Sequence, residues 1–346
     1  MRILVTGHHG YIGSVTAPLL ANAGHEVVGL DMFYYRGCDF GPSRTASEEE
    51  PLDVRDVDAE RLQGFDAIVH LAALSNDPLG DLRPEWTYDI NLEGTVALAK
   101  AAKAAGVDRF VFASSCSMYG ASTSDDSLDE TAPLRPLTPY ADSKVRSEAA
   151  LHELADASFS PVYMRNATAY GVSPRLRLDV VLNNLAAWAH TTGKIRLLSD
   201  GSAWRPLVHV EDIARATLAL LEAPREVVYD QAFNVGSADQ NVRIRDLAET
   251  LHRLLDCEVE TSGDAMADPR SYRVDFSKLA TSVPSFTCEW GVGRGAEELA
   301  GAYVAFGLTL EDFTEIGRYM RLSQLKRLLV ERQLDDSLRW RDPAAA

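Results

Sequence analysis

A tyrosine and a lysine stand four residues apart in the stretch TPYADSKVRSEAALHE, residues 138–153. The run 139–156 has the pattern of a helix, so the phenol of Tyr140 and the ammonium of Lys144 share one helical face. A free tyrosine has a pKa of about 10, too high for a good base near neutral pH, and a neighbouring cation lowers it. The spacing predicts a tyrosine that removes a hydroxyl proton, against the alternative of a chance surface pair.

A serine precedes this pair by 25 residues. Ser115 follows the apolar run 109–114, which reads as a strand, and ligands of doubly wound sheets bind at the carboxyl edge of the strands. A hydroxyl at that edge can hydrogen-bond the reacting oxygen and hold it against Tyr140. The order of the three residues favours a catalytic set of Ser115, Tyr140 and Lys144.

Three glycines mark the turn between the first strand and the first helix. The stretch VTGHHGYIGS contains Gly7, Gly10 and Gly13, where a pyrophosphate can approach the backbone and the helix N-terminus. Asp31 ends the next strand, 24 residues after Gly7, and can accept hydrogen bonds from ribose hydroxyls. A carboxylate there repels a 2′-phosphate, so the pattern predicts NAD and not NADP. The alternatives are a structural turn and an ordinary cap at the strand end.

Apolar runs alternate with helical patterns over the first 170 residues. The predicted strands cover 2–6, 26–30, 66–71, 109–114 and 161–165. The predicted helices cover 11–23, 84–105 and 139–156. This alternation indicates an α/β fold with a doubly wound (Rossmann) parallel sheet covered on both faces. The stretches 32–51 and 117–137 are irregular and polar, and loops of this length tend to be functional.

The alternation weakens after residue 170. Further strands are expected at 195–198, 206–210 and 231–235. Further helices are expected at 178–192, 211–223, 243–255, 296–305 and 310–331. We therefore predict an NAD-binding Rossmann domain at 1–170, with later contributions from about 205–237. Residues 171–346 are expected to form mainly a smaller mixed α/β substrate-binding lobe and C-terminal helices.

The composition narrows the class of protein. A formal net charge of −17 on 346 residues argues against non-specific nucleic-acid binding, which needs a basic face. No apolar run reaches the ~18 residues of a membrane span, and the N-terminus has no signal-peptide pattern. Four scattered cysteines predict reduced thiols in a cytoplasmic protein and no metal site. They are Cys38, Cys116, Cys257 and Cys288.

Eight motifs, in their order and spacing, resemble one family over about residues 1–285. They are TGHHGYIG at 6–13, DVRD at 53–56, HLAA at 70–73, NLEGT at 91–95, SSCSMYG at 114–120, YADSK at 140–144, RPLVHVEDIA at 205–214 and FNVGS at 233–237. This pattern is similar to the extended short-chain dehydrogenase/reductase family, in its NAD-dependent epimerase/dehydratase branch that modifies nucleotide sugars.

The resemblance implies roles for further residues. Asp53 and Val54 would lie beside the adenine of NAD, and Asn91 would support the cofactor site from a helix behind it. Lys144 would also hydrogen-bond the nicotinamide ribose. The cofactor-binding set implied is Gly7, Gly10, Tyr11, Ile12, Gly13, Asp31, Asp53, Val54, Leu71, Ala72, Ala73, Asn91 and Lys144.

The second half of the chain supplies candidates for the substrate. Arg205 and Asn184 match family positions that hold the nucleotide's phosphates, and the other arginines could offset a diphosphate. Solvated surface arginines are the alternative. The predicted substrate-binding set is Ser75, Cys116, Thr168, Arg175, Asn184, Arg205, Arg243 and Arg270. His209 is expected to pack or cap locally, and Asp212 to order the start of its helix.

Several positions depart from the family pattern. Ser75 occupies the site of a lysine of UDP-galactose 4-epimerases, and Cys116 and Ser117 replace the Asp-Glu pair of 4,6-dehydratases. Thr168 and Val172 stand where asparagine and proline are usual. These changes argue against 4,6-dehydration and favour an unusual sugar. Cys116 could donate a proton, but a thiol there is more often a small packing residue.

The leading hypothesis is an NAD-dependent nucleotide-sugar 4-epimerase that acts through a transient 4-keto sugar, with Tyr140 as base. Net reduction or dehydrogenation, or decarboxylation, by a member of the same family is the second hypothesis. A non-catalytic NAD-sensing module is the third. By analogy with the family, we expect a homodimer packed through the helices at 84–105 and 139–156.

Overall fold

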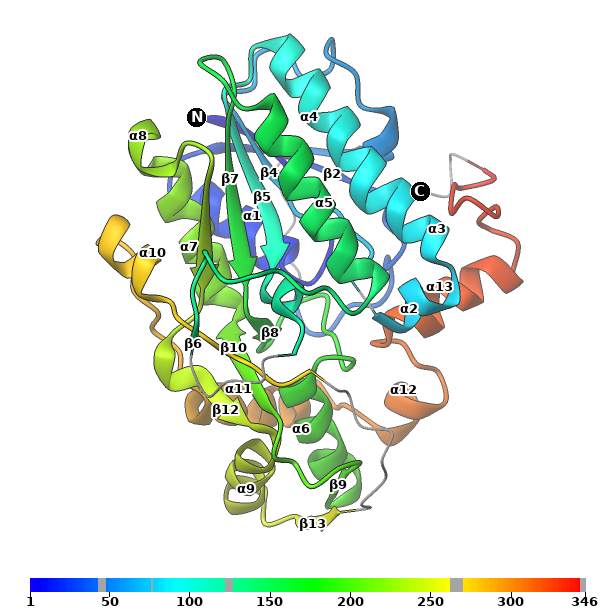
Figure 1. Ribbon diagram of the computed structural model, residues 1–346. Coiled ribbons are helices and arrows are strands. Elements are labelled where there is room, and N and C mark those ends of the chain that lie inside the picture. The colour runs from blue at the N-terminus through cyan, green and yellow to red at the C-terminus, as the bar shows by residue number, and fades with distance from the viewer. Residues whose placement is uncertain (43–47, 76, 122–126, 262–269, 343–346) are drawn as a thin grey trace.

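Seven parallel strands form a large sheet in the computed structural model (Figure 1). The spatial order is β11-β7-β5-β4-β1-β2-β3, which confirms the predicted doubly wound parallel sheet. The strands are β1 (Arg2–Thr6), β2 (Glu26–Asp31), β3 (Glu48–Pro51), β4 (Ala67–His70), β5 (Arg109–Ser115), β7 (Ser160–Asn166) and β11 (Gln231–Val235). The structure describes residues 1–42, 48–75, 77–121, 127–261 and 270–342. Parts of the two predicted irregular stretches, 43–47 and 122–126, lie outside the described residues.

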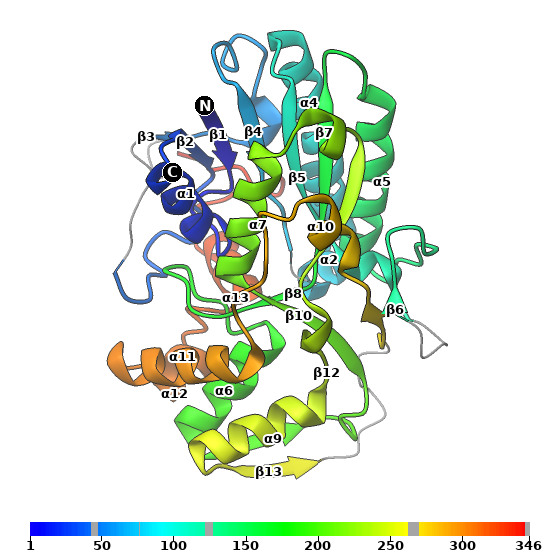
Figure 2. The ribbon, with the colours of Figure 1, turned by 90° about the vertical axis from the view of Figure 1, so that its left-hand side faces the viewer.

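Helices cover both faces of this sheet (Figures 1 and 2). Alternate residues of a strand point to opposite faces, so Ile3 and Val5 pack with one helical layer and Leu4 with the other. The first layer contains α1 (Gly13–Asn22) and α7 (Val210–Glu222). The second contains α4 (Gly94–Ala105) and α5 (Pro139–Leu154). Burial on both faces explains why these strands read as continuous apolar runs.

Strand β3 was not expected from the sequence. It falls in the stretch predicted to be irregular, and its four residues are EEEP. The strand pairs only with β2, at the edge of the sheet. Charged residues and proline are tolerated on such an edge, and they hide the strand from an apolar pattern.

The predicted helix at 84–105 is not regular. It consists of α3 (Pro84–Thr87), a π-helical segment (Tyr88–Glu93) and α4. The π-helical segment contains Asn91, whose carbonyl oxygen accepts hydrogen bonds from the hydroxyls of Thr95 and Ser147. π-Helical turns are rare and often occur at functional sites.

A smaller lobe of helices and short strands lies at the carboxyl end of the sheet (Figures 1 and 2). It contains a three-stranded sheet in the order β12-β10-β8 and a two-stranded sheet of β13 and β9. Its elements are β8 (Thr168–Tyr170), α6 (Val181–Thr192), β9 (Lys194–Leu197), β10 (Trp204–His209), β12 (Asn241–Arg243), α9 (Ile244–Leu255), β13 (Glu258–Thr261), α11 (Val292–Ala305) and α12 (Leu310–Thr314). Other short elements include α2 (Asp77–Leu82), β6 (Ser127–Leu128), α8 (Arg225–Val228), β14 (Arg273–Val274) and α10 (Ser277–Ser282). No helix in the described ranges is long and apolar enough to cross a membrane.

The prediction of one helix at 310–331 is wrong. The chain instead forms α12 and a second helix, α13 (Arg321–Val330), with Gly317 between them in a left-handed conformation at φ +60°. A Cβ atom on Gly317 would lie 2.8 Å from the Cβ of Ser323, so this turn requires glycine. Helix α13 lies beside the Rossmann part (Figure 1).

An ion pair joins β7 to α5, the helix that carries Tyr140 and Lys144. Nη2 of Arg165 lies 2.7 Å from Oε2 of Glu148, and both side chains are only 8% exposed. Nη1 of Arg165 also donates a hydrogen bond to the carbonyl oxygen of Glu130. Because burial removes both charges from water, each depends on the other for compensation.

We expect Glu148→Ala to lower the free energy of unfolding by about 3–5 kcal/mol, because Arg165 would remain buried without its counter-ion. Urea unfolding of the full chain measures this change. The control is Arg253→Ala, which removes an exposed pair with Glu249 on α9 and should cost less than about 1 kcal/mol. Equal effects of the two substitutions would contradict a stabilising role for the buried pair.

Candidate active site

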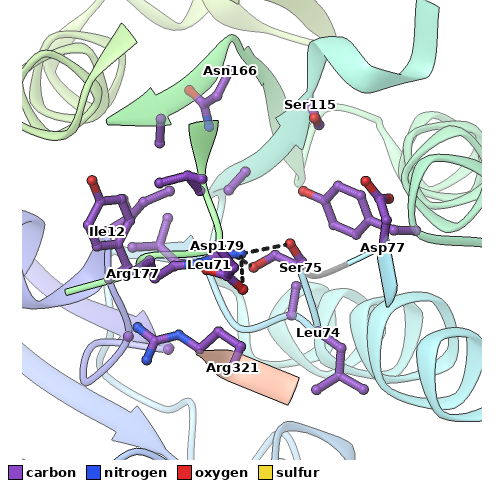
Figure 3. A pocket seen from close by; sticks show the side chains of 18 of the residues that line it. Ile12, Leu71, Leu74, Ser75, Asp77, Ser115, Asn166, Arg177, Asp179 and Arg321 are labelled. Atoms are coloured by element: carbon purple, nitrogen blue, oxygen red, sulfur yellow. Dashed lines mark hydrogen bonds and ion pairs between the residues drawn. The ribbon is translucent and has the colours of Figure 1, made fainter. Parts of the chain in front are cut away.

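A cavity of about 1060 Å³ lies where the carboxyl ends of the large sheet meet the smaller lobe (Figure 3). Typical small-molecule sites measure ~300–1,000 Å³, so this one has room for a dinucleotide and a second ligand. Most of the predicted site residues line it: Gly7, Gly10, Tyr11, Ile12, Gly13, Asp31, Asp53, Val54, Leu71, Ala72, Ala73, Ser75, Ser115, Tyr140, Lys144, Thr168, Asn184, Arg205 and Arg270.

The glycine turn forms one wall of this cavity. Gly7 has φ +72°, and a Cβ atom there would lie 2.7 Å from the backbone nitrogen of Ala72. A Cβ atom on Gly13 would lie 2.1 Å from the carbonyl oxygen of Gly7. Only glycine fits these positions, and the absence of side chains leaves the backbone and the start of α1 open to a pyrophosphate. This geometry fits a dinucleotide.

Asp31 stands at the end of β2, beside this turn. Its carboxylate accepts hydrogen bonds from the backbone amides of His9 at 3.0 Å and Phe33 at 2.7 Å. Burial raises the pKa of Asp31, while His8 and these two amides lower it. The carboxylate is therefore held in place at the cavity wall, where it can accept from ribose hydroxyls.

Asp53 also lines the cavity, with its carboxylate already engaged. Arg55 donates to both oxygens of Asp53, at 2.9 Å from Nε and 2.6 Å from Nη2. Asn91 does not line the cavity but lies behind its wall, where it exchanges hydrogen bonds of 2.8 and 3.0 Å with the backbone of Leu74. Leu74 itself lines the cavity, so Asn91 fixes the loop that follows β4.

The three predicted catalytic residues face the same cavity from β5 and α5. Ser115 is the last residue of β5, and its hydroxyl donates to Oγ of Ser117 at 2.9 Å. Helix α5 begins after Thr138, whose hydroxyl accepts from the backbone amide of Ala141 at 3.2 Å. This cap fixes the first turn of the helix, which carries Tyr140.

Lys144 is 3% exposed and is directed toward the sheet. Its Nζ donates to the carbonyl oxygen of Ala113 at 2.7 Å and lies 5.9 Å from the centroid of the Tyr140 ring. Burial lowers the pKa of Lys144 to about 7, and Glu148 on the next turn of α5 opposes this shift. Nζ of Lys144 therefore holds its proton weakly near neutral pH, although it lies close to the phenol.

The pKa of Tyr140 is raised to about 12, contrary to the expectation that Lys144 lowers it. Burial is the main cause, and the carboxylate of Asp77 adds to it. Ser115 and the cations of Arg177 and Arg270 act in the opposite direction. The protein's own groups therefore favour the neutral phenol, because desolvation outweighs the nearby cations.

Five of the predicted substrate residues line the cavity. Arg205, on β10, donates to the carbonyl oxygens of Trp204 and Arg270. Arg270 also forms an ion pair of 2.8 Å with Asp77. The full set is Ser75, Thr168, Asn184, Arg205 and Arg270.

Among the described residues, three other predicted substrate residues do not line the cavity. Arg175 is buried, donates to Nδ1 of His9 and pairs with Asp39. Arg243 lies over the ring of Trp204, with its guanidinium carbon 4.7 Å from the centroid. Cys116 donates its thiol to the carbonyl oxygen of Arg165, and burial raises the thiol's pKa. These placements do not support substrate contact by Arg175, Arg243 or Cys116.

Sequence reasoning missed Arg177, which lies two residues after Arg175 in the run RLRLD. Its Nη1 donates to Oγ of Ser75 at 2.9 Å, and its Nε pairs with Asp179 at 2.8 Å (Figure 3). The two arginines were indistinguishable by type, and only the path of the loop decides which one reaches the cavity. Asp77 and Arg321 also line the cavity, and no motif indicated them. The described residues hold no cluster of His, Cys, Asp or Glu suited to a metal ion.

Comparisons with known proteins agree with this geometry. UDP-glucose 4-epimerase of Bacillus subtilis is 31% identical over 263 residues, which are 68% of this chain and 77% of that protein. UDP-glucose 4-epimerase of Erwinia amylovora is 28% identical over 337 residues, 86% of this chain and 95% of that protein. The structure of MoeE5 in complex with UDP-glucuronic acid and NAD superposes with a TM-score of 0.77 at 26% identity, over 88% of this chain and 99% of that one. The model of the NAD dependent epimerase/dehydratase family matches residues 3–236, and the chain belongs to this family of enzymes.

Proposed function

We propose that the protein is an NAD-dependent nucleotide-sugar 4-epimerase in which Tyr140 is the base. The observation that carries this proposal is that Ser115, Tyr140 and Lys144 face one cavity together with the glycine turn. The UDP-glucose 4-epimerases among the similar proteins support the reaction class. MoeE5, solved with NAD and UDP-sugars, supports the ligand classes.

The cofactor would lie along the carboxyl edge of the sheet. The glycine turn would hold its pyrophosphate, Asp31 the adenosine ribose and Lys144 the nicotinamide ribose. Asp53 and Val54 would flank the adenine, and the loop from Leu71 to Ala73 would line the path between the two ends. NAD supplies reversible hydride transfer to and from a sugar carbon.

The protein's own groups would manage the proton. The Ser115 hydroxyl hydrogen-bonds the sugar C4 oxygen and holds it toward the phenol of Tyr140. Tyr140 takes the C4 hydroxyl proton as the sugar is oxidised to a 4-keto form, and it returns the proton when the sugar is reduced from the opposite face. A tyrosine with a pKa of about 12 needs added positive charge to act as a base near neutral pH. The ammonium of Lys144 lies close enough to provide part of it.

The nucleotide half of the substrate would lie on the smaller lobe. Arg205 and Arg270 approach each other at this wall, and Asn184 lies on α6 nearby. Arginine side chains there can bind the two phosphates, despite the strongly negative net charge of the protein. Ser75 and Thr168 remain to contact the sugar, which must be able to turn over between the two hydride transfers.

Tyr140→Phe should lower kcat by about 10²–10⁴-fold, because the base is removed while the shape of the ring is kept. Affinity for NAD⁺, measured by titration calorimetry, should change little. Tyr88→Phe is the control, since the Tyr88 hydroxyl donates to Asp142 and is not among the cavity-lining groups described. Turnover of Tyr140→Phe at the wild-type rate would refute the assignment of the base.

The balance of cofactor separates an epimerase from the alternative members of the family. We expect a panel of nucleotide sugars to yield a C4 epimer by NMR, with no net change in NADH absorbance. Stoichiometric production or consumption of NADH would indicate a dehydrogenase or a keto-reductase instead. Tight NAD⁺ binding without conversion of any sugar would favour a sensing module.

Lys144→Met should stabilise the protein in the absence of nucleotide. The pKa of Lys144 is about 7 in the folded protein and ~10.5 in an unfolded chain, so the unfolded state binds the proton more tightly. The buried ammonium therefore lowers the free energy of unfolding. This destabilisation is complete below pH 7 and disappears as the pH rises toward 10.5. The variant should gain on the order of 4 kcal/mol in free energy of unfolding at pH 7, and this gain should shrink at higher pH.

Urea unfolding at several pH values tests this prediction. Lys100→Met removes an exposed lysine from α4 and is the control for loss of one positive charge. A gain from Lys144→Met that does not depend on pH, or an equal gain from Lys100→Met, would refute it.

A further inference from the structure

The N-terminus of helix α13 faces the cavity from a part of the chain outside the family match at 3–236. Met320, Arg321, Leu322 and Ser323 all line the cavity. No side chain among the described residues caps this helix, and Met320 at the N-cap position offers no suitable acceptor. The first backbone amides of a helix lack intrahelical partners and form the positive end of its dipole.

The side chain of Arg321 adds a buried cation to this end. Arg321 is 5% exposed, and its guanidinium carbon lies 4.0 Å from the centroid of the Tyr35 ring. Nη2 donates to the carbonyl oxygen of Arg175 at 2.7 Å. Nη1 is buried and has no hydrogen-bond partner within the described part of the chain. A buried charged donor without a partner is costly, so this position favours an anion.

The surrounding electrostatics also favour an anion. Burial lowers the pKa of Arg321 and Arg177 lowers it further, while Tyr35 and the carboxylate of Asp179 act in the opposite direction. Figure 3 shows Arg321 and Arg177 in the same part of the cavity, away from Asp77 and Ser115. Two arginines and the positive end of a helix thus meet at one place, where Asp179 is the carboxylate paired with Arg177 (Figure 3).

The neighbours of α13 identify which half of the cavity this is. Arg321 stacks on Tyr35, and Nε2 of Gln324 donates to the carbonyl oxygen of Tyr34 at 2.9 Å. Both tyrosines follow Asp31, the residue at the end of β2 that would bind the adenosine ribose. Arg205 and Arg270, the candidates for the substrate's phosphates, are contributed by the smaller lobe and the segment after it. Helix α13 therefore serves the cofactor half.

We propose that Arg321 and the first turn of α13 bind the diphosphate of the dinucleotide, on the side opposite the glycine turn. The diphosphate would accept from the guanidinium of Arg321 and from the uncapped amides of residues 321–323, while the glycine turn and α1 contact it from the other side. This inference rests on the NAD-binding part of the proposed function. It does not depend on which sugar reaction the enzyme catalyses.

The residues after α13 hold the helix against this site. Nε1 of Trp340 donates to the carbonyl oxygen of Met32 at 2.6 Å, and the hydroxyl of Tyr34 donates to the carbonyl oxygen of Leu338 at 2.5 Å. Arg339 forms an ion pair with Asp56. These contacts fix α13 relative to the segment after β2.

Arg321→Gln in the full chain tests the proposal by titration calorimetry with NAD⁺, ADP-ribose and adenosine. We expect the dissociation constants of NAD⁺ and ADP-ribose to rise by about 10- to 100-fold, and that of adenosine to stay unchanged. Lys326→Gln removes a cation from the exposed face of the same helix and should leave all three constants unchanged. Arg321→Lys should recover part of the lost affinity, and it replaces the glutamine variant if that variant does not fold.

Other outcomes would overturn the inference. Equal losses for adenosine and NAD⁺ would show that Arg321 only supports the wall through Tyr35. Unchanged NAD⁺ affinity, with weakened binding of a nucleotide sugar, would assign the site to the substrate's diphosphate.

A further outcome separates this inference from the proposed function. If NAD⁺ binding depends on Arg321 as expected but the wild type epimerises no sugar, the proposed reaction fails and this inference stands.

Discussion

All seven strands of the large sheet run in the same direction, so the loops that follow them meet at one edge. The glycine turn follows β1, Asp31 ends β2, and Ser115 ends β5. These residues are far apart in the sequence, and the parallel order of the strands brings them to one cavity. Close packing of Gly7 against the loop after β4 then fixes the two innermost loops relative to each other. The chemistry of the site depends on this edge being rigid.

Several arginines line the cavity of a protein whose net charge is strongly negative. The net charge of −17 would repel a dinucleotide and a nucleotide sugar, both of which carry phosphates. The cavity offsets this with four arginines from four different segments, which are Arg177, Arg205, Arg270 and Arg321. Several of them are held by carboxylates, as Arg177 is by Asp179 and Arg270 by Asp77. In each pair the carboxylate orients the cation and offsets part of the cost of burying it.

The sequence was sufficient to predict the sheet, its topological class and the meeting of Ser115, Tyr140 and Lys144 at one cavity. Apolar strands buried on both faces and the spacing of Tyr140 and Lys144 are local signals, and they survive tertiary packing. Other features have no local signal. The acidic edge strand β3 and the break at Gly317 are set by which neighbour each segment meets. The choice of Arg177 over Arg175 depends on the path of one loop. The raised pKa of Tyr140 reflects burial, which a single sequence does not report.

The contacts of residues 338–340 with the segment after β2 affect the order in which the cavity can form during folding. Tyr34 and Leu338, and likewise Met32 and Trp340, are joined by hydrogen bonds across about nine-tenths of the chain length. Contacts between such distant segments require the largest loop closure, and during synthesis the N-terminal residues emerge long before their partners. The parallel sheet has all its strands by residue 235, whereas the segment that contacts Met32 and Tyr34 is synthesised later, since it includes Leu338 and Trp340. A nascent chain can thus form the parallel sheet early, and the wall of the cavity that depends on Leu338 and Trp340 can form only later.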